Sequence, residues 1–226
     1  MQPFILRERQ YSTVDFVYTG FYETDLDKVA LVVESMKKAK EILVTDNGIG
    51  EDLNINIFGW KNNELAVIAQ LKNTHKIEKD TRLESIMDAA CILRRGWAID
   101  EFTFAAEGYC SLKPAETKNH DLAKLFAVTD SPVKECLSFT HIRSDDHLFI
   151  SVPYSLNLGK NVNFGDALWY PGGQVMRDIT YPAALKAALQ LDAVPVDETI
   201  DKETYFGTLA SGVMNAGFEV YYRDDM

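Results

Sequence analysis

Hydrophobic positions recur every three or four residues in several stretches of the chain, a spacing that predicts amphipathic helices. The clearest stretch is residues 81–96, where the apolar positions are Leu83, Ile86, Met87, Ala90, Cys91 and Leu93. Thr81 and Glu84 form an S/T-x-x-E pattern, which predicts a capping box at the start of this helix. Gly96, followed by Trp97, predicts a glycine stop at its end.

After Trp97 the hydrophobic period changes to two, which predicts a strand over residues 101–109. One face carries the apolar side chains Phe102, Phe104 and Ala106. The other face carries Glu101, Thr103, Ala105, Glu107 and Tyr109. This unequal polarity predicts a sheet with one face on the core and the other partly in water.

A second amphipathic helix begins near Thr24 or Asp25, either of which is a suitable N-cap. Its hydrophobic stripe is Leu26, Val29, Ala30, Val33 and Met36. Cations favour the negative C-terminal end of a helix dipole. We therefore predict that this helix ends near Lys37, Lys38 and Lys40. Residues 44–52 then have the composition of a loop, and they lack the third glycine and the G-K-[ST] sequence of a phosphate-binding loop.

Two hairpins are predicted from alternating segments joined by short polar turns. The first joins residues 53–60 to 64–71 through Asn62 and Asn63. The second joins residues 133–142 to 147–155 through a two-residue turn at Ser144 and Asp145. Its register places Leu137 opposite Val152, Phe139 opposite Ile150 and His141 opposite Leu148, so both strands present their apolar sides to one core.

The remaining pattern completes an α+β fold. Further helices are predicted at residues 120–127, 182–191 and 202–215, and further strands at 13–18, 162–170 and 218–222. We expect a mixed, mainly antiparallel sheet of about six to eight strands, including the two hairpins, packed by four or five helices. Residues 1–226 are expected to form one domain, with 171–226 as a C-terminal helical appendage that ends in a strand.

Charge and cysteine usage narrow the class of protein. The net charge of −11 disfavours nucleic acids and anionic membranes as partners. The cysteines are odd in number and include no C-x-x-C pair, which is typical of reduced thiols in a cytosol-like compartment. The N-terminus lacks a signal-peptide pattern, and no apolar run approaches the ~18 residues of a spanning helix. We therefore expect a cytoplasmic protein that does not enter a membrane.

Glu101, Glu107 and Cys110 are the candidate catalytic residues. The two glutamates share a strand face, but six residues of strand span ~20 Å, whereas paired glycosidase carboxylates lie ~5–9.5 Å apart. Either glutamate would therefore need a partner from another strand. Cys110 ends the strand and could act with a histidine, although nothing in the sequence places one beside it.

The densest polar group surrounds the second hairpin turn and contains the candidate metal ligands His141, Asp145, Asp146 and His147. The predicted register places His141 and His147 on opposite faces, so they do not converge on one ion. Asp145 and Asp146 are also residues that a turn favours. We therefore predict no cofactor.

Aromatic residues gather in the C-terminal third of the chain. The candidate binding residues are Trp169, Tyr170, Tyr181, Tyr221 and Tyr222. Tyrosine and tryptophan are enriched in protein–protein interfaces, so those that are not in the core are candidates for a binding surface.

Residues 104–142, FAAEGYCSLKPAETKNHDLAKLFAVTDSPVKECLSFTHI, resemble small soluble bacteriophage-encoded proteins whose function is uncharacterised. The resemblance is one of general style and assigns no role to any residue. It implies a phage protein that acts in the host cytoplasm or in the virion.

The sequence thus favours a non-enzymatic interaction or structural protein with an acidic surface, which binds a protein partner or self-associates as a homo-oligomer. Two alternatives remain open. One is a carboxylate- or metal-dependent hydrolase with its site near Glu107 and Cys110. The other is a protein that binds a small-molecule ligand in a cleft beside the sheet.

Overall fold

The computed structural model describes residues 23–47, 52–71, 77–111, 133–157, 161–170, 180–194 and 199–223. The strand expected at residues 13–18 and the helix expected at residues 120–127 lie outside these ranges.

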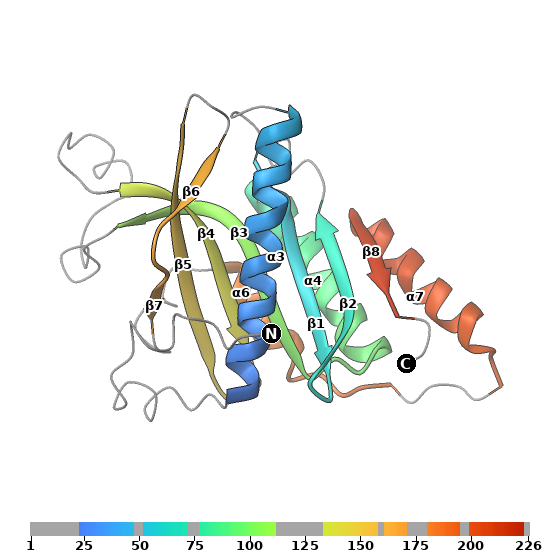
Figure 1. The fold of residues 1–226 in the computed structure, drawn as a ribbon. Coiled ribbons are helices and arrows are strands. Elements are labelled where there is room, and N and C mark those ends of the chain that lie inside the picture. The colour runs from blue at the N-terminus through green and yellow to red at the C-terminus, as the bar shows by residue number, and fades with distance from the viewer. Residues whose placement is uncertain are drawn as a thin grey trace.

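The centre of the fold is an open antiparallel sheet in the order β6-β5-β4-β3-β1-β2-β8, with β7 also paired to β5 (Figure 1). Every pair of described strands is antiparallel. The strands are β1 (Ile55–Lys61), β2 (Glu64–Leu71), β3 (Glu101–Ser111), β4 (Val133–Ile142), β5 (His147–Leu156), β6 (Val162–Phe164), β7 (Leu168–Tyr170) and β8 (Phe218–Tyr222). The expected α+β class is confirmed.

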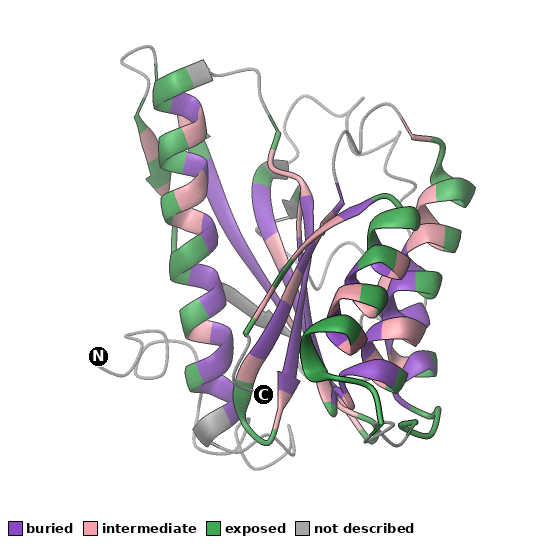
Figure 2. Cartoon of the chain, turned by 90° about the vertical axis from the view of Figure 1, so that its right-hand side faces the viewer, coloured by how far each residue is buried: buried purple, intermediate pink, exposed green. Residues whose placement is uncertain are grey.

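Helices cover both faces of this sheet. They are α3 (Glu23–Asn47), α4 (Lys79–Gly96), α6 (Thr180–Ala188) and α7 (Lys202–Asn215). Seen along the sheet, α3 lies on one side and the other described helices lie on the opposite side (Figure 2). The core is correspondingly divided into one cluster on the α4 side and another beneath α3.

β3 occupies the middle of the sheet, between β1 and β4. The predicted division of its faces is confirmed, since Phe102 and Phe104 join the cluster on the α4 side while Ala105 joins the cluster beneath α3. The other face is partly in water, as predicted, since Tyr109 is 55% exposed, but α3 covers its middle. Thr103 and Ala105 are both 0% exposed.

Both hairpins form, and the second has the predicted register. Asn62 and Asn63 have φ angles of 51° and 68°, the left-handed conformation that a tight hairpin turn requires. In the second hairpin the paired residues are Leu137 and Val152, Phe139 and Ile150, and His141 and Leu148. Turn chemistry and hydrophobic alternation agree here, so the register is determined locally.

The predicted ends of α4 are wrong at both termini. The helix begins at Lys79, so Thr81 lies inside it, and no side chain caps its first turn. Gly96 is still helical, and the positive φ that follows the helix belongs to Ala98, at 55°. Gly96 serves packing instead, because a Cβ at this position would lie 2.5 Å from both methyl carbons of Leu209 in α7.

The predicted ends of α3 are also wrong. Asp25 lies within the helix rather than capping it, and the helix continues to Asn47. Lys37, Lys38 and Lys40 are therefore internal, and residues 44–47 are helical rather than part of a loop. The side chain of Lys40 is 1% exposed and forms an ion pair with the sheet, so it does not act as a helix terminator.

The C-terminal elements belong to the same sheet and core as the rest of the described chain. β8 pairs with β2 at one edge of the sheet, and its Phe218 joins the cluster on the α4 side. α6 and α7 contribute Leu185 and Phe206 to that cluster. Gly217, with a φ of 95°, lies in the turn between α7 and β8.

Two glycine-to-alanine substitutions test this packing with opposite signs. Gly96→Ala should lower the free energy of unfolding by about 1–3 kcal/mol, because Leu209 must move to admit the methyl group. Gly207→Ala in α7 should raise it by about 0.5–1 kcal/mol, because nothing lies within 4 Å of the added carbon and alanine favours a helix. Urea denaturation measures both, and equal effects would contradict the packing described.

Candidate functional site

The interface between α3 and the sheet contains buried charges at both ends. Lys28 and Lys40 are 5% and 1% exposed, and each forms an ion pair with a glutamate of β3. The Glu101 cluster comprises Asp25, Lys28, Glu101, His141 and Arg143. The Glu107 cluster comprises Lys40, Glu107 and Tyr154.

The two clusters are separated by the geometry of the helix and the strand. Twelve helical residues from Lys28 to Lys40 rise ~18 Å, and six strand residues from Glu101 to Glu107 rise ~20 Å. The two rises match, so each lysine meets its own glutamate. The prediction that Glu101 and Glu107 do not pair is consistent with these separate partners.

The Glu107 carboxylate is fully engaged. Its Oε1 lies 2.7 Å from Lys40 Nζ and accepts a hydrogen bond of 2.9 Å from the Tyr154 hydroxyl, and its Oε2 accepts one of 2.7 Å from the Leu53 N–H. Burial raises the pKa of Glu107 above its ordinary value, although these three donors oppose the shift. Burial and the neighbouring Glu107 carboxylate raise the pKa of Tyr154. These contacts give Glu107 a structural role.

The Glu101 cluster joins three elements. Lys28 Nζ contacts Glu101 Oε2 and lies 3.3 Å from Asp25 Oδ1. Arg143 extends the cluster, since its Nη1 lies 3.2 Å from Asp25 Oδ2 and two of its N–H groups bind the carboxylate of Asp145.

His141 lies on the sheet side of this cluster and is 0% exposed. Its Nδ1 is 2.8 Å from Thr103 Oγ1, which accepts a hydrogen bond from Trp60 Nε1. Its Nε2 is 3.4 Å from Glu101 Oε2. Burial alone would raise the pKa of Glu101, but hydrogen bonds from His141 and Lys28 outweigh it and lower this pKa to about 2.

The order Thr103, His141, Glu101 resembles a nucleophile, base and acid, but the arrangement does not suit nucleophilic catalysis. Thr103 is 0% exposed and accepts from Trp60, so a substrate cannot reach its hydroxyl. We interpret this row of contacts as a device that orients the imidazole.

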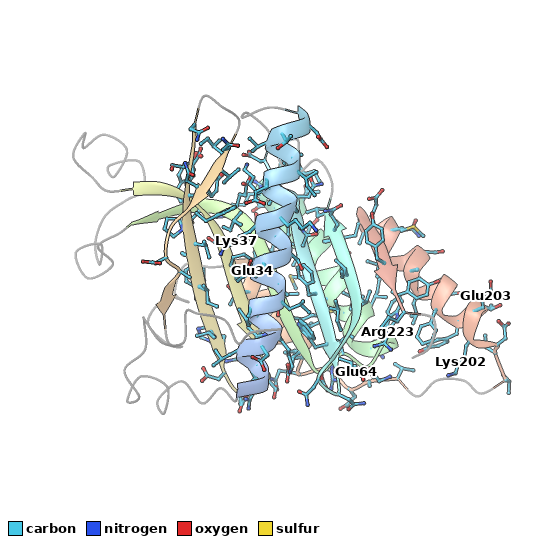
Figure 3. All side chains as sticks on the ribbon, viewed as in Figure 1. Glu34, Lys37, Glu64, Lys202, Glu203 and Arg223 are labelled. Carbon is cyan, nitrogen blue, oxygen red and sulfur yellow. The ribbon has the colours of Figure 1, made fainter. Side chains whose placement is uncertain are left out.

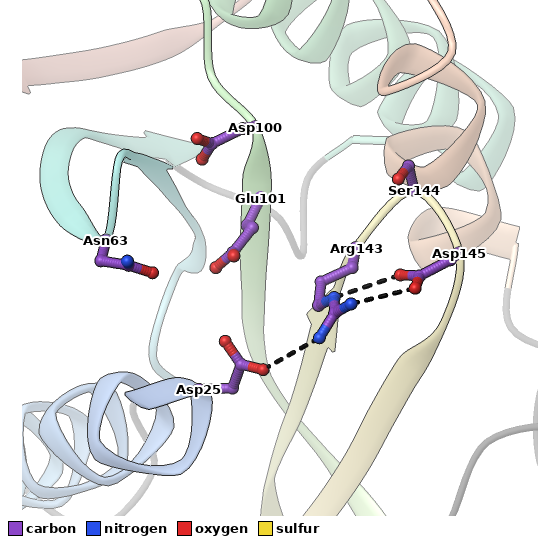
Figure 4. Close-up of a pocket in the computed structure, with 7 residues that line it drawn as sticks. All are labelled: Asp25, Asn63, Asp100, Glu101, Arg143, Ser144 and Asp145. Atoms are coloured by element: carbon purple, nitrogen blue, oxygen red, sulfur yellow. Dashed lines mark hydrogen bonds and ion pairs between the residues drawn. The ribbon is translucent and has the colours of Figure 1, made fainter. Parts of the chain in front are cut away.

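A pocket of about 450 Å³ opens above the Glu101 cluster (Figure 4). It lies between the β1–β2 turn and the β4–β5 turn, with the start of β3 between them. The lining residues are all polar or charged, and four of them carry carboxylates. They are Asp25, Asn63, Asp100, Glu101, Arg143, Ser144 and Asp145.

The structure separates the predicted metal ligands. His141 faces α3, whereas His147 pairs with Ile142 and faces the other side of the hairpin. Asp145 binds Arg143, and Asp146 accepts from the His147 N–H, so both aspartates have turn contacts. His147 is 6% exposed, and neither ring nitrogen has a hydrogen-bond partner among the described residues.

The predicted aromatic binding residues divide between core and surface. Tyr181 packs against Phe104, and Tyr222 packs against Trp97. Tyr221 is 56% exposed. The side chains of Trp169, Tyr170 and the catalytic candidate Cys110 lie outside the described residues.

The contribution of α3 to the site is not predicted from the sequence, whose pattern indicates a helix cap at Asp25 and a helix end at Lys40. One signal was present for Lys40, because it lies four residues after Met36 and so continues the hydrophobic stripe. A lysine on such a stripe indicates a buried charge that needs a partner.

Exposed ion pairs provide a contrast with these clusters. Lys37 pairs with Glu34, and Arg223 with Glu64, each at 2.9 Å on the surface (Figure 3). Such pairs contribute ~0–1 kcal/mol.

Comparison with protein-family models, curated proteins and solved structures finds no match to this chain. Among the described residues, no helix is both long and apolar enough to cross a membrane. The function must therefore be argued from the chemistry of the site.

Substitution of Lys40 tests the buried pairing. Lys40→Met should lower the free energy of unfolding by about 3–5 kcal/mol, because Glu107 would remain buried without a counter-charge. Lys37→Met, three residues away in an exposed pair, should change it by at most about 1 kcal/mol. Urea denaturation of both variants measures the contrast. The double variant Lys40→Met/Glu107→Gln should recover most of the loss, and a double variant as unstable as Lys40→Met would contradict this interpretation.

Stability should fall in mild acid because of His147. Burial and then Lys186 lower the pKa of His147 below 6.5, whereas Asp146 opposes the shift. The unfolded chain therefore binds a proton at His147 more readily, so stability is complete above about pH 6.5 and is lost as pH falls through the folded-state pKa. His147→Leu should remove this loss, which urea denaturation from pH 7.5 to 5 would detect. An unchanged pH dependence in the variant would contradict the assignment.

Proposed function

We propose that this protein is a non-enzymatic binding protein whose pocket receives a lysine or arginine side chain of a protein partner. The observation that supports the proposal is the composition of the pocket, in which four carboxylates exceed the two cations that contact them, Arg143 and Lys28. This excess of negative charge favours a cationic group and disfavours phosphates and carboxylates.

The charge of the whole chain acts in the same direction. A net charge of −11 attracts a basic partner over a distance and increases the rate of encounter, most strongly at low salt. Self-association through this pocket would require a lysine or arginine from a second copy. We propose a partner in the host cytoplasm or in the virion, as the expected bacteriophage origin implies.

The contacts favour this proposal over both alternatives. Pockets for small organic ligands are lined mostly by apolar residues, whereas each described residue that lines this pocket is polar or charged. A hydrolase centred on Glu107 would need an available carboxylate oxygen, but both oxygens of Glu107 already accept hydrogen bonds.

A charged peptide and its neutral counterpart test the proposal. We expect an arginine hexapeptide to shift the amide resonances of residues 62–63, 100–101 and 143–145, and a citrulline hexapeptide, which keeps the shape without the charge, to shift none of them. Asp100→Asn should weaken the arginine peptide about tenfold, a change of ~1.4 kcal/mol measurable by calorimetry. The substitution retains an oxygen that can accept the hydrogen bond which the Asn62 N–H now donates to Asp100.

Asp46→Asn is the matched control. Asp46 is exposed near the far end of α3, about 30 Å along the helix from Asp25. Equal weakening by the two substitutions would show that the peptide responds to overall charge and would contradict a specific pocket.

A further inference from the structure

We propose that Asp25, Glu101 and His141 form a binding site for a divalent transition-metal ion such as Zn²⁺, and that the Lys28 ammonium competes with the ion for this site. The site lies beneath the pocket and shares two carboxylates with it. The inference does not rest on the proposed binding of a protein partner, and the two can fail separately.

The ligand atoms already lie close together. One atom each from Asp25, Glu101 and His141 lie within 4.8 Å of one another, and they come from α3, β3 and β4. His141 Nε2 is 3.4 Å from Glu101 Oε2 and 4.0 Å from Asp25 Oδ1. Zinc binds nitrogen and oxygen at ~2.0–2.2 Å in a tetrahedron, so ligand atoms about 3.4 Å apart are needed. Small side-chain movements would complete this geometry.

Access to the site is provided by the pocket. Asp25 and Glu101 line its walls, so an ion from solvent reaches them directly. His141 lies deeper and supplies the imidazole nitrogen that favours transition metals over Mg²⁺ or Ca²⁺. The fourth coordination position would face the pocket and hold water.

Hydrogen bonds from neighbouring residues orient the proposed ligands. A histidine that binds a metal usually donates its other ring N–H to a nearby acceptor. Thr103 Oγ1, 2.8 Å from His141 Nδ1, is placed to accept that proton. Arg143 contacts the Oδ2 of Asp25, which leaves Oδ1 directed at the cluster.

Lys28 shows that this position attracts a cation. Its ammonium contacts both Asp25 and Glu101, so it occupies the place that a metal ion would take. Asp25 and Glu101 carry two negative charges, which match one divalent ion once the ammonium has left. The flexible stem of lysine allows the ammonium to move away while the carboxylates stay in place.

The Glu107 cluster is an internal control. It also pairs a buried lysine of α3 with a glutamate of β3, but Tyr154 stands where the Glu101 cluster has a histidine. Lys28→Met and Lys40→Met are therefore chemically equal substitutions, of which one removes a competitor for a metal and the other does not.

The first experiment uses chelator-treated protein and Zn²⁺. Lys28→Met should bind Zn²⁺ at least about tenfold more tightly than the wild type in calorimetry, and Zn²⁺ should raise its Tm. Lys40→Met should show neither gain. If Lys28→Met gains no more affinity than Lys40→Met, the proposal is overturned.

The second experiment does not depend on the folding of a lysine variant. The chain has four histidines, so long-range ¹H–¹⁵N spectra of the wild type resolve each imidazole. Zn²⁺ should shift Nε2 of His141, and Glu101→Gln should abolish the shift. Zn²⁺ that shifts other histidines only, or that binds Glu101→Gln as well as wild type, is adventitious and overturns the proposal.

Asp100→Asn distinguishes this inference from the proposed function. Asp100 lines the pocket but is not a proposed ligand of the ion. This variant should lose affinity for the arginine peptide and keep its affinity for Zn²⁺. Loss of Zn²⁺ binding in Asp100→Asn would contradict the assigned ligands, whatever the peptide does.

Discussion

Two buried lysines of α3 pair with two glutamates of β3, and these ion pairs hold the helix in its place on the sheet. A charge taken out of water must meet an opposite charge or lose several kcal/mol. Lys28 and Lys40 meet this requirement only when the helix lies parallel to the strand in one position along it. A shift of the helix by one turn, ~5.4 Å, would separate both pairs.

Apolar packing and ion pairing therefore make different contributions to the position of α3. Val29, Val33 and Met36 are buried beneath the helix and supply the favourable transfer of apolar surface from water. The free energy of apolar burial is not directional, so it tolerates small displacements of the helix. The ion pairs are directional, and we infer that they select one placement of α3 on the sheet.

The lysine–glutamate pairs at the two ends of α3 differ in their surroundings. At Glu107 the tyrosine hydroxyl and a backbone N–H complete the hydrogen bonds of the carboxylate, so the pair is closed. At Glu101 the neighbours are a second carboxylate, an imidazole and an open pocket. The chemistry proposed for this protein lies at that end because the charge there exceeds what Lys28 and Arg143 neutralise.

Features that depend on neighbouring residues could be predicted from the sequence. The second hairpin register follows from a two-residue turn and alternating side chains, and the division of β3 into two faces follows from its period of two. Helix ends were less predictable. Ala98 takes the positive φ expected at Gly96, whereas Gly96 remains helical and lies close to Leu209.

Local alternation establishes which residues share a face, whereas contacts between distant segments establish what each face packs against. The separation of His141 from His147 was predicted correctly, because it depends on strand alternation alone. The meeting of Asp25, Glu101 and His141 was not, because it requires α3 to lie over the polar face of β3. That placement depends on contacts between segments far apart in the chain, for which a local pattern carries no signal beyond the single lysine on the stripe of α3.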